Sequence, residues 1–224
     1  AVARLLREHP GVHLSVAKDN WANLFPLLRK RDLDLAVIDV TAAEDDPEMK
    51  VIKLLNHQGY FVLRAQHPLL EAQRSRPLEA TWNYPFVSTA RFPTAVFKEL
   101  AGRLLGSKKA TIFGGKALLS VACESLYMMK IIATESNAVT VLPLHLVIDE
   151  VERGELVAIP APDWFRGNFG IAYLAHRSLS PLGETFVRMV HQADAELLEW
   201  EHKTARRLFK TKEPRNGKSA PVGV

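Results

Sequence analysis

The sequence predicts an α/β protein, and two patterns along its 224 residues support this class. Short apolar runs rich in Val, Ile and Leu alternate with segments of about ten residues whose apolar side chains recur at helical spacing. Gly, Pro and Ser stand at the boundaries between these segments. Alternation of this kind is typical of parallel sheets with helices on both faces. With 47% hydrophobic residues, the chain can bury a core of that size.

The first elements expected are a helix over residues 1–8 and then a strand, a helix and a strand within residues 13–38. From Trp21 onward, apolar residues recur at i, i+3, i+4 and i+7, so they share one helical face. Pro26 suits only the first turn of a helix, so this helix either begins near Asn23 or is kinked. The apolar run over residues 33–38 indicates a strand covered on both faces.

A basic triplet, Arg29 to Arg31, joins that helix to the strand. The triplet could contact nucleic acid, or it could be the solvated end of the helix. Cations in the last helical turn complement the helix dipole, so we favour the helix end and keep contact with an acidic partner as the alternative.

The same alternation continues to residue 197. Ser125 is a plausible N-cap, Gly154 a helix stop, and Ser180 with Pro181 a helix start. The strands expected are 59–65, 84–89, 117–124, 138–143, 155–160 and 169–178, and the helices are 92–106, 126–133, 144–153 and 181–197.

The net charge of +4 is unevenly distributed. Residues 202–224 hold seven Lys and Arg against one Glu, a net +6, which leaves −2 for residues 1–201. We expect residues 202–224 to be a disordered basic tail with nonspecific attraction to anions. The folded part is therefore not a basic, nucleic-acid-binding body.

Composition also bears on the compartment. No apolar run approaches the roughly 18 residues of a membrane helix, and the single Cys123 excludes an internal disulfide and fits a reducing compartment. We expect a cytoplasmic protein.

Enzyme motifs are absent from the sequence. The eight histidines form no His-Glu-x-x-His pattern and pair with no second cysteine, so a zinc site is not expected. Cys123 in an apolar strand is more typical of a core residue than of a nucleophile. Gly114 and Gly115 match neither phosphate-binding fingerprint, and there is no Gly-x-Ser-x-Gly elbow. No cofactor and no metal are expected.

Polar residues do follow the expected strands. In open α/β sheets, ligands bind beyond the carboxyl ends of strands, where helix N-termini offer free N–H groups. The alternative is that these residues are ordinary caps and loop ends. The candidates from position are Lys18, Asn20, Thr41, Ser88, Thr89, Cys123, Glu124 and Ser125.

Five segments resemble the effector-binding domain of LysR-type transcriptional regulators. In chain order they are "LLREHPGVHLSVAKDNWANLFPLLRKRDLDLAVID", "YFVLRAQHPLL", "NAVTVLPLHLV", "ERGELVAIP" and "YLAHRSLSPLGETFV". Each match alone is loose, but together they follow the family's order over nearly all of residues 4–190.

The resemblance implies a fold like a type 2 periplasmic binding protein, in which two Rossmann-like α/β lobes are joined by two crossover strands. Lobe I is expected at residues 1–60 plus 170–201 and lobe II at residues 61–169, with the crossovers in residues 59–65 and 169–175. A small-molecule effector would bind between the lobes. Its expected contacts lie near Asn20, Asp39 to Thr41, Ser88, Thr89 and Cys123 to Ser125.

The sequence also departs from the family. Glu135, Ser136 and Asn137 stand where a Gly-x-Gly turn is common in the family, so we expect that turn to differ in shape. The family's first strand and its DNA-binding winged helix-turn-helix would precede Ala1. The chain itself is therefore not expected to read DNA.

We expect the chain to be the regulatory domain of a bacterial LysR-type regulator. It should form a homodimer or homotetramer with residues 1–8 at the interface. It would reach DNA only through the missing N-terminal domain, and no contact with membranes is expected. The alternatives are a transporter's solute-binding protein and an enzyme such as a dehydratase. An enzyme would depend on Glu124, Asp39 or Cys123. Lys18 and Arg91 suggest a weak preference for anionic effectors.

Overall fold

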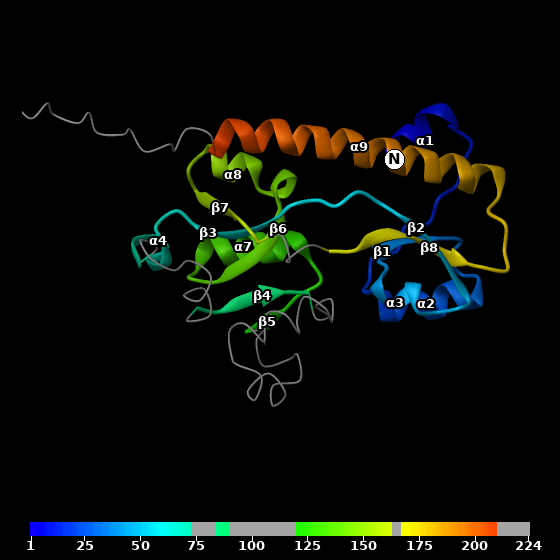
Figure 1. Cartoon of the computed structure of the whole chain (residues 1–224), viewed down its shortest axis with the longest axis horizontal. Helices are drawn as coiled ribbons and strands as arrows, with labels where there is room; N and C mark the ends of the chain where they lie inside the picture. The colour runs from blue at the N-terminus through cyan, green and yellow to red at the C-terminus, as the bar shows by residue number, and fades with distance from the viewer. Residues whose placement is uncertain (73–83, 90–119, 163–166, 210–224) are drawn as a thin grey trace, which may run out of the picture.

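The computed structural model describes residues 1–72, 84–89, 120–162 and 167–209. The strands described there form two sheets, one with the order β1-β8-β2 and one with the order β5-β4-β6-β3-β7 (Figure 1). The strands are β1 Ala36–Asp39, β2 Met49–Lys53, β3 Gly59–Arg64, β4 Phe86–Ser88, β5 Val121–Ala122, β6 Val139–Pro143, β7 Leu156–Pro160 and β8 Phe169–Leu174. The helices are α1 Val2–Glu8, α2 Trp21–Lys30, α3 Thr41–Glu44, α4 Pro68–Ala72, α7 Leu126–Glu135, η1 Leu144–Leu146, α8 Ile148–Glu152 and α9 Pro181–Phe209.

The α/β class is confirmed, but the expectation of parallel sheets is wrong. β8 pairs antiparallel with β1 and β2, and β3 pairs antiparallel with β6 and β7. Only β4 forms parallel pairs among the described strands, with β5 and β6. The reason is topological: β3 and β8 each enter their sheet from the other sheet, so they run against their neighbours. The chain passes between the sheets at residues 54–58 and again between β7 and β8, where residues 161–162 and 167–168 are described.

The strand expected over residues 13–18 does not form. Residues 12–20 have no strand partner among the described residues, and Leu14 and Val16 are 41% and 74% exposed. A strand needs a neighbour to satisfy its backbone. Nor is β1 covered on both faces: it is an edge of the three-stranded sheet, and Val37 is exposed.

The helix α2 begins at Trp21, ahead of the expected Asn23, because the Asn20 side chain accepts a hydrogen bond from the Ala22 N–H (3.1 Å). Pro26 therefore lies inside the helix, where it removes one backbone donor. Burial of the apolar face on both sides of Pro26 offsets this loss. The helix ends at Arg31, whose φ of 66° is left-handed.

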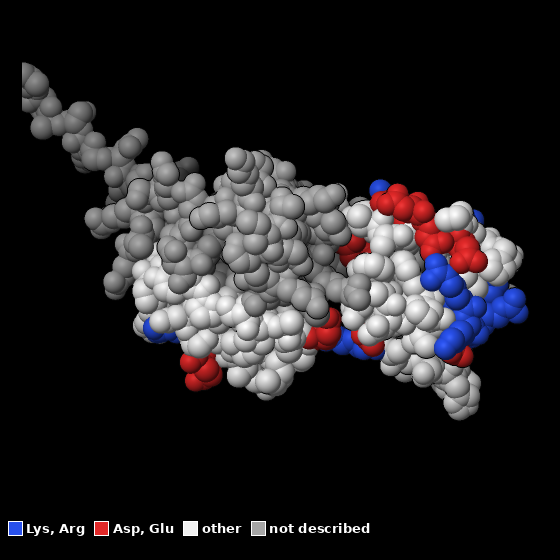
Figure 2. Space-filling view, turned by 90° about the horizontal axis from the view of Figure 1, so that it is seen from below, with Lys and Arg blue, Asp and Glu red and all other residues white. Residues whose placement is uncertain are grey.

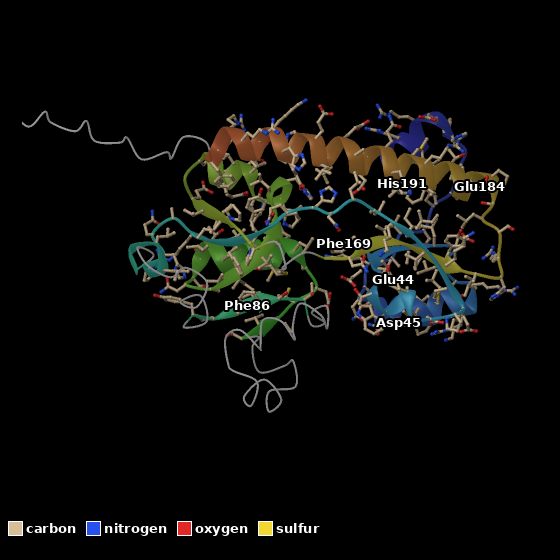
Figure 3. The ribbon with its side chains drawn as sticks, in the orientation of Figure 1. Glu44, Asp45, Phe86, Phe169, Glu184 and His191 are labelled. Atoms are coloured by element: carbon tan, nitrogen blue, oxygen red, sulfur yellow. The ribbon has the colours of Figure 1, made fainter. Side chains whose placement is uncertain are left out.

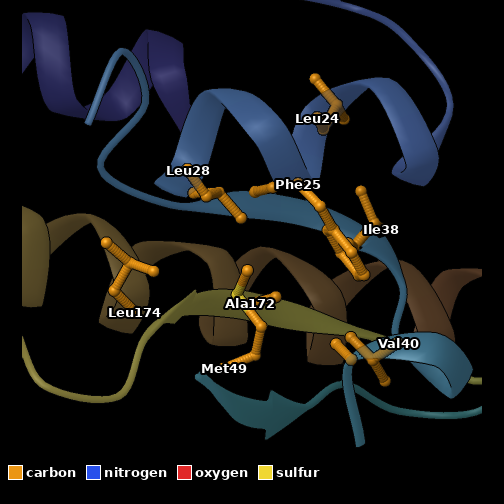
Figure 4. Close-up of a cluster of buried hydrophobic side chains, with 10 residues drawn as sticks. Leu24, Phe25, Leu28, Ile38, Val40, Met49, Ala172 and Leu174 are labelled. Carbon is orange, nitrogen blue, oxygen red and sulfur yellow. The ribbon is translucent and has the colours of Figure 1, made fainter. Parts of the chain in front are cut away.

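Each sheet has its own apolar core. Leu24, Phe25 and Leu28 of α2 pack on the three-stranded sheet against Ile38 and its neighbours (Figure 4). In the five-stranded sheet, α7, η1 and α8 supply the partners of the buried strand residues. Their central members are Tyr60, Val62, Val87, Met129, Ala138, Leu142, Leu144, Val147, Leu156 and Ala158.

The turn expected to differ from the family is built by Ser136 instead of glycine. Its hydroxyl donates to the carbonyl of Ile132 (2.6 Å) and accepts the Ala138 N–H (3.0 Å). The next residue, Asn137, accepts a hydrogen bond from the guanidinium of Arg64 (2.9 Å). One serine therefore ends α7 and starts β6.

The long helix α9 spans both sheets (Figure 1). Val187 and Val190 pack with Ile171 of the three-stranded sheet, whereas Leu208 packs in the core of the five-stranded sheet and Phe209 stacks on Tyr60. The tail predicted from residue 202 is wrong at its start, because α9 runs to Phe209. The rest of that predicted tail, residues 210–224, lies outside the described residues.

The expected helix 92–106, Arg91, Gly114, Gly115 and the first residues of the strand expected at 117–124 lie outside the described residues as well. Within the described part, no helix has a stretch apolar enough and free enough of charge to cross a bilayer.

Candidate functional site

The register of the strands places Asp39 and Ser88 at the ends of the two sheets that lie nearest the passages between them. Asp39, the last residue of β1, pairs with Phe169, the first residue of β8. In the other sheet, Pro143 at the end of β6 pairs with Gly59 at the start of β3, and β4 runs parallel to β6. The ends of β1 and β4 therefore both point toward the passages between the sheets, β1 toward the start of β8 and β4 toward the start of β3.

On the three-stranded sheet, the Asp39 carboxylate organises the strand end. One oxygen accepts the Thr41 N–H (3.1 Å) and the other accepts the Asn168 N–H (3.3 Å), while the Val40 N–H donates to the Asn168 carbonyl (2.7 Å). The Asn168 side chain donates to Glu44 (2.8 Å). Asp39 thus fixes the second passage to β1, and the half-buried Thr41 stands beside it.

On the five-stranded sheet, the structure brings Ser88 and the segment 123–125 together. The Cys123 N–H donates to the Ser88 carbonyl (2.9 Å), next to the parallel pair of β4 and β5. Ser125 is the N-cap of α7 and accepts the Met128 N–H (3.3 Å), as expected. Ser88 is buried, whereas Thr89, Cys123 and Glu124 are partly buried.

The remaining predicted residues lie at the start of α2. Asn20 uses its amide oxygen as the helix cap, and Asp19 accepts hydrogen bonds from the Asn20 N–H (2.8 Å) and the Asn23 side chain (2.8 Å). Because α2 packs on β1 in the opposite direction, its first turn lies toward the Ile38 end of the strand (Figure 4). Lys18 is exposed in the unpaired segment before this cap.

The basic triplet at the other end of α2 serves as a helix end. Arg29 pairs with Asp46 and with Glu48, the latter at 2.8 Å, and Arg31 closes the helix through its backbone. Figure 2 shows Lys and Arg side chains next to Asp and Glu side chains at this end of the molecule. The preferred interpretation of the triplet is therefore confirmed for Arg29 and Lys30, which lie in the last turn.

A hollow of about 470 Å³ lies elsewhere, at the far end of the three-stranded sheet. Lys50, Tyr173, Arg177 and Glu184 contribute to its wall, and the Lys50 ammonium lies 5.8 Å from the centre of the Tyr173 ring. The wall carries both signs of charge, and Arg177 is paired with Asp34 (3.1 Å). This hollow is separate from the strand ends that the sequence indicates.

Two residues at the strand ends were missed from the sequence. Asn168 holds the end of β1, and Phe169 is 49% exposed between the two sheets (Figure 3). A Cβ atom at Gly167 would lie 2.3 Å from the Phe169 ring, so the glycine leaves the space that the ring occupies. Asn168 directly precedes the strand expected over residues 169–178, and Phe169 begins it. This position beside a strand end was the signal from which both could have been proposed as site residues.

A second polar cluster, also missed, joins the first passage to α9. His57 lies between Glu201 and Asp194, with His145 on the far side of Glu201. Glu201 falls at core spacing on α9 and is only 2% exposed, and a carboxylate at a core position signals a buried partner. Within the described residues, no group of three or more His, Cys, Asp or Glu side chains is placed to hold a metal ion.

Comparison with known proteins gives consistent matches. The family described as "LysR substrate binding domain" matches residues 1–195. The SDS degradation transcriptional activation protein of Pseudomonas sp. (strain ATCC 19151) is 32% identical over 199 residues, which are 87% of this chain and 62% of that protein. The chain thus spans less than two thirds of the length of this relative.

Solved structures share the fold at low identity. The effector-binding domain of QuiR in complex with shikimate has a TM-score of 0.61 at 16% identity, covering 87% of this chain and 88% of that one. The regulatory domain of CcmR from Synechocystis PCC6803 in complex with 2-PG has a TM-score of 0.61 at 19% identity, covering 86% and 90%. The expected two-lobed fold is confirmed by these neighbours, and since the family match extends over residues 1–195, this chain belongs to the LysR substrate-binding domain family.

Proposed function

We propose that the chain is the ligand-sensing regulatory domain of a LysR-type transcriptional regulator and that it binds a small-molecule effector between its two sheets. The observation that supports this most directly is the register, which turns the ends of β1 and β4 toward the same passages. The proposed contacts are the predicted residues Lys18, Asn20, Asp39, Thr41, Ser88, Thr89, Cys123, Glu124 and Ser125, with Asn168 and Phe169 added.

The proposed mechanism is a shift between two arrangements of the lobes. A ligand that contacts Thr41, which begins α3 after β1, and Ser88 of β4 gains more contacts when the two sheets approach each other. Such a ligand stabilises the closed arrangement by its difference in affinity for the two states. The change would reach DNA through a part of the regulator outside this chain, in the cytoplasm of a bacterium. In this mechanism the chain binds its effector without converting it.

The proposed effector is a small anion. Lys18 supplies an exposed cation two residues before the Asn20 cap of α2, and the hydroxyls of Thr41, Ser88 and Ser125 can donate to carboxylate oxygens. Two proteins of the same fold were solved with shikimate and with 2-PG, which supports a small polar molecule as the class.

A thermal-shift screen tests this proposal. Organic acids, amino acids and aromatic carboxylates are compared with their neutral amides, and at least one acid is expected to raise the melting temperature, since a ligand at 100 times its Kd stabilises by about 2.7 kcal/mol. Thr41→Val should abolish the shift, whereas the control Thr185→Val on α9 should keep it. Stabilisation by neutral or cationic compounds alone would refute the preference for anions, and no stabilisation by any compound counts against the site.

We also propose a homodimer with α1 at its interface, which pairs further into a tetramer in the full-length protein. Leu5 anchors α1 in the structure, and Arg4 pairs with Glu196 of α9. On the outer face of α1, Val2 and Leu6 are 37% and 43% exposed. The exposed Leu14 follows in the unpaired segment. An apolar strip of this kind favours association with another protein surface.

A further inference from the structure

One histidine stands between two acidic side chains where the two sheets are joined. His57 belongs to the passage 54–58, and its Nδ1 lies 2.7 Å from a Glu201 oxygen while its Nε2 lies 2.8 Å from an Asp194 oxygen. Asp194 and Glu201 are two turns apart on α9. The imidazole therefore bridges two turns of the helix from the side.

This geometry requires a particular protonation state. Ionised carboxylates only accept hydrogen bonds, and a neutral imidazole has a single N–H, so only the imidazolium can donate to both acids. The side chains of Glu201 and Asp194 are 2% and 9% exposed, so little water is present to replace a missing donor. The hydrogen bond to Glu201, opposed by burial and assisted by Asp194, raises the pKa of His57 to about 9.

Other groups complete the cluster. The second oxygen of Glu201 lies 3.3 Å from Nδ1 of His145 in η1, and the second oxygen of Asp194 accepts the Leu55 N–H (2.8 Å). Burial opposes ionisation of Glu201, but its hydrogen bonds with His145 and His57 lower the pKa overall. Tyr60 of β3 faces Glu201. Its burial and, to a smaller extent, the negative charge of Glu201 raise the pKa of the tyrosine.

The position of the cluster in the fold gives it a mechanical role. α9 packs on the three-stranded sheet before Asp194 and on the five-stranded sheet after Glu201 (Figures 1 and 3). The two passages are themselves tied, because the Gln58 side chain donates to the Ala161 carbonyl (2.7 Å). A change in the angle between the sheets must therefore move the passage 54–58 relative to α9 at the point where His57 holds the two together.

We propose that His57 is the positioning residue of the hinge: its imidazolium pins the passage 54–58 to α9 and restricts the angle between the sheets, and loss of its proton frees that angle. The inference rests on the proposed function in one respect, that the angle between the sheets reports effector occupancy. Because the angle between the sheets is no longer restricted once His57 loses its proton, the response of the regulator to its effector should weaken in strongly alkaline conditions.

The test measures the angle directly and without a ligand. Spin labels at Lys30→Cys and Glu135→Cys, in a Cys123→Ser background, report the distance between the two sheets in the full chain. At about pH 7 we expect one narrow distance distribution, which broadens with a midpoint near pH 9. His57→Gln should show the broad distribution both at about pH 7 and above the midpoint near pH 9. The matched control is His202→Gln, which changes an exposed histidine on α9 and should behave like wild type.

A second readout concerns the imidazole itself. In an NMR titration, the His57 ring should titrate near pH 9, and Glu201→Gln should move this midpoint toward the ordinary value of about 6.5. A His57 ring that titrates near the ordinary value of 6.5, or a His57→Gln distribution as narrow as wild type, overturns the proposal. Since no effector is present, either result leaves the proposed function standing, and a failed ligand screen leaves the hinge result intact.

Discussion

At the scale of single residues, Thr140 carries a conflict that the fold does not resolve. It lies on β6 between β3 and β4, it is fully buried, and its hydroxyl is the one buried side-chain polar atom in the described part without a hydrogen-bond partner. A buried hydroxyl without a partner costs about 1–3 kcal/mol.

Thr140→Val should therefore stabilise the protein, because it replaces the hydroxyl with a methyl group of similar volume. We expect a gain of about 1 kcal/mol in the free energy of unfolding, measured by urea denaturation. Thr140→Ser is the matched control, since it keeps the hydroxyl and loses the methyl group, and it should destabilise. A valine variant less stable than wild type would show that the hydroxyl has a partner after all.

At the scale of elements, the sequence predicted well wherever a pattern depends only on neighbours along the chain. The cap at Ser125, the stop at Gly154 and the strand from Gly59 were all placed within a residue or two. The segment at residues 13–18 has a good strand pattern, yet forms no strand, because pairing depends on a neighbour that the pattern itself does not supply.

The candidate site divides in the same way. Asn20 and Ser125 could be recognised because caps have local signatures, and both proved to be caps. Asn168 had only its position before an expected strand as a signal, and the contacts of Asn168 and His57 could not be predicted, since their partners lie 129 and 144 residues away along the chain. Burial of Glu201 on α9 likewise depends on the packing of two sheets against one helix.

The cluster around His57 makes stability depend on pH in a defined window. The folded pKa of about 9 exceeds the unfolded value of 6.5, so the stabilisation is complete below about pH 6.5 and is lost as the pH rises through about 9. The loss is on the order of 3 kcal/mol. Glu201 acts on the acid side, because its lowered pKa gives stability that disappears as the pH falls below its ordinary value of 4.5.

Urea denaturation at several pH values between about 6 and about 9.5 tests this window. Glu201→Gln should flatten the profile, and His202→Gln should leave it unchanged. The range stops below the ordinary tyrosine pKa of 10.0 because Tyr60, whose pKa is raised, adds a loss of the same sign there. A wild-type profile flat across the window contradicts the bridged geometry.

At the scale of the whole molecule, the proposed dimer predicts a change in mass with one substitution. Light scattering on the eluting protein should give twice the chain mass of 25.1 kDa for wild type and the single mass for Leu6→Glu, which places a charge on the apolar strip of α1. Arg7→Glu introduces the same side chain at the next exposed position and should remain dimeric. A monomeric wild type at high concentration refutes the interface.

The two sheets also share one structural support, and this governs how the molecule comes apart. α9 contributes Val187 to the cluster around Ile171 on the three-stranded sheet and Leu208 to the core of the five-stranded sheet, so neither keeps its full complement of side chains once the helix detaches. Heating should consequently produce a single calorimetric transition instead of two, and a proteolytic cut within the middle of that helix should release both halves of the protein together.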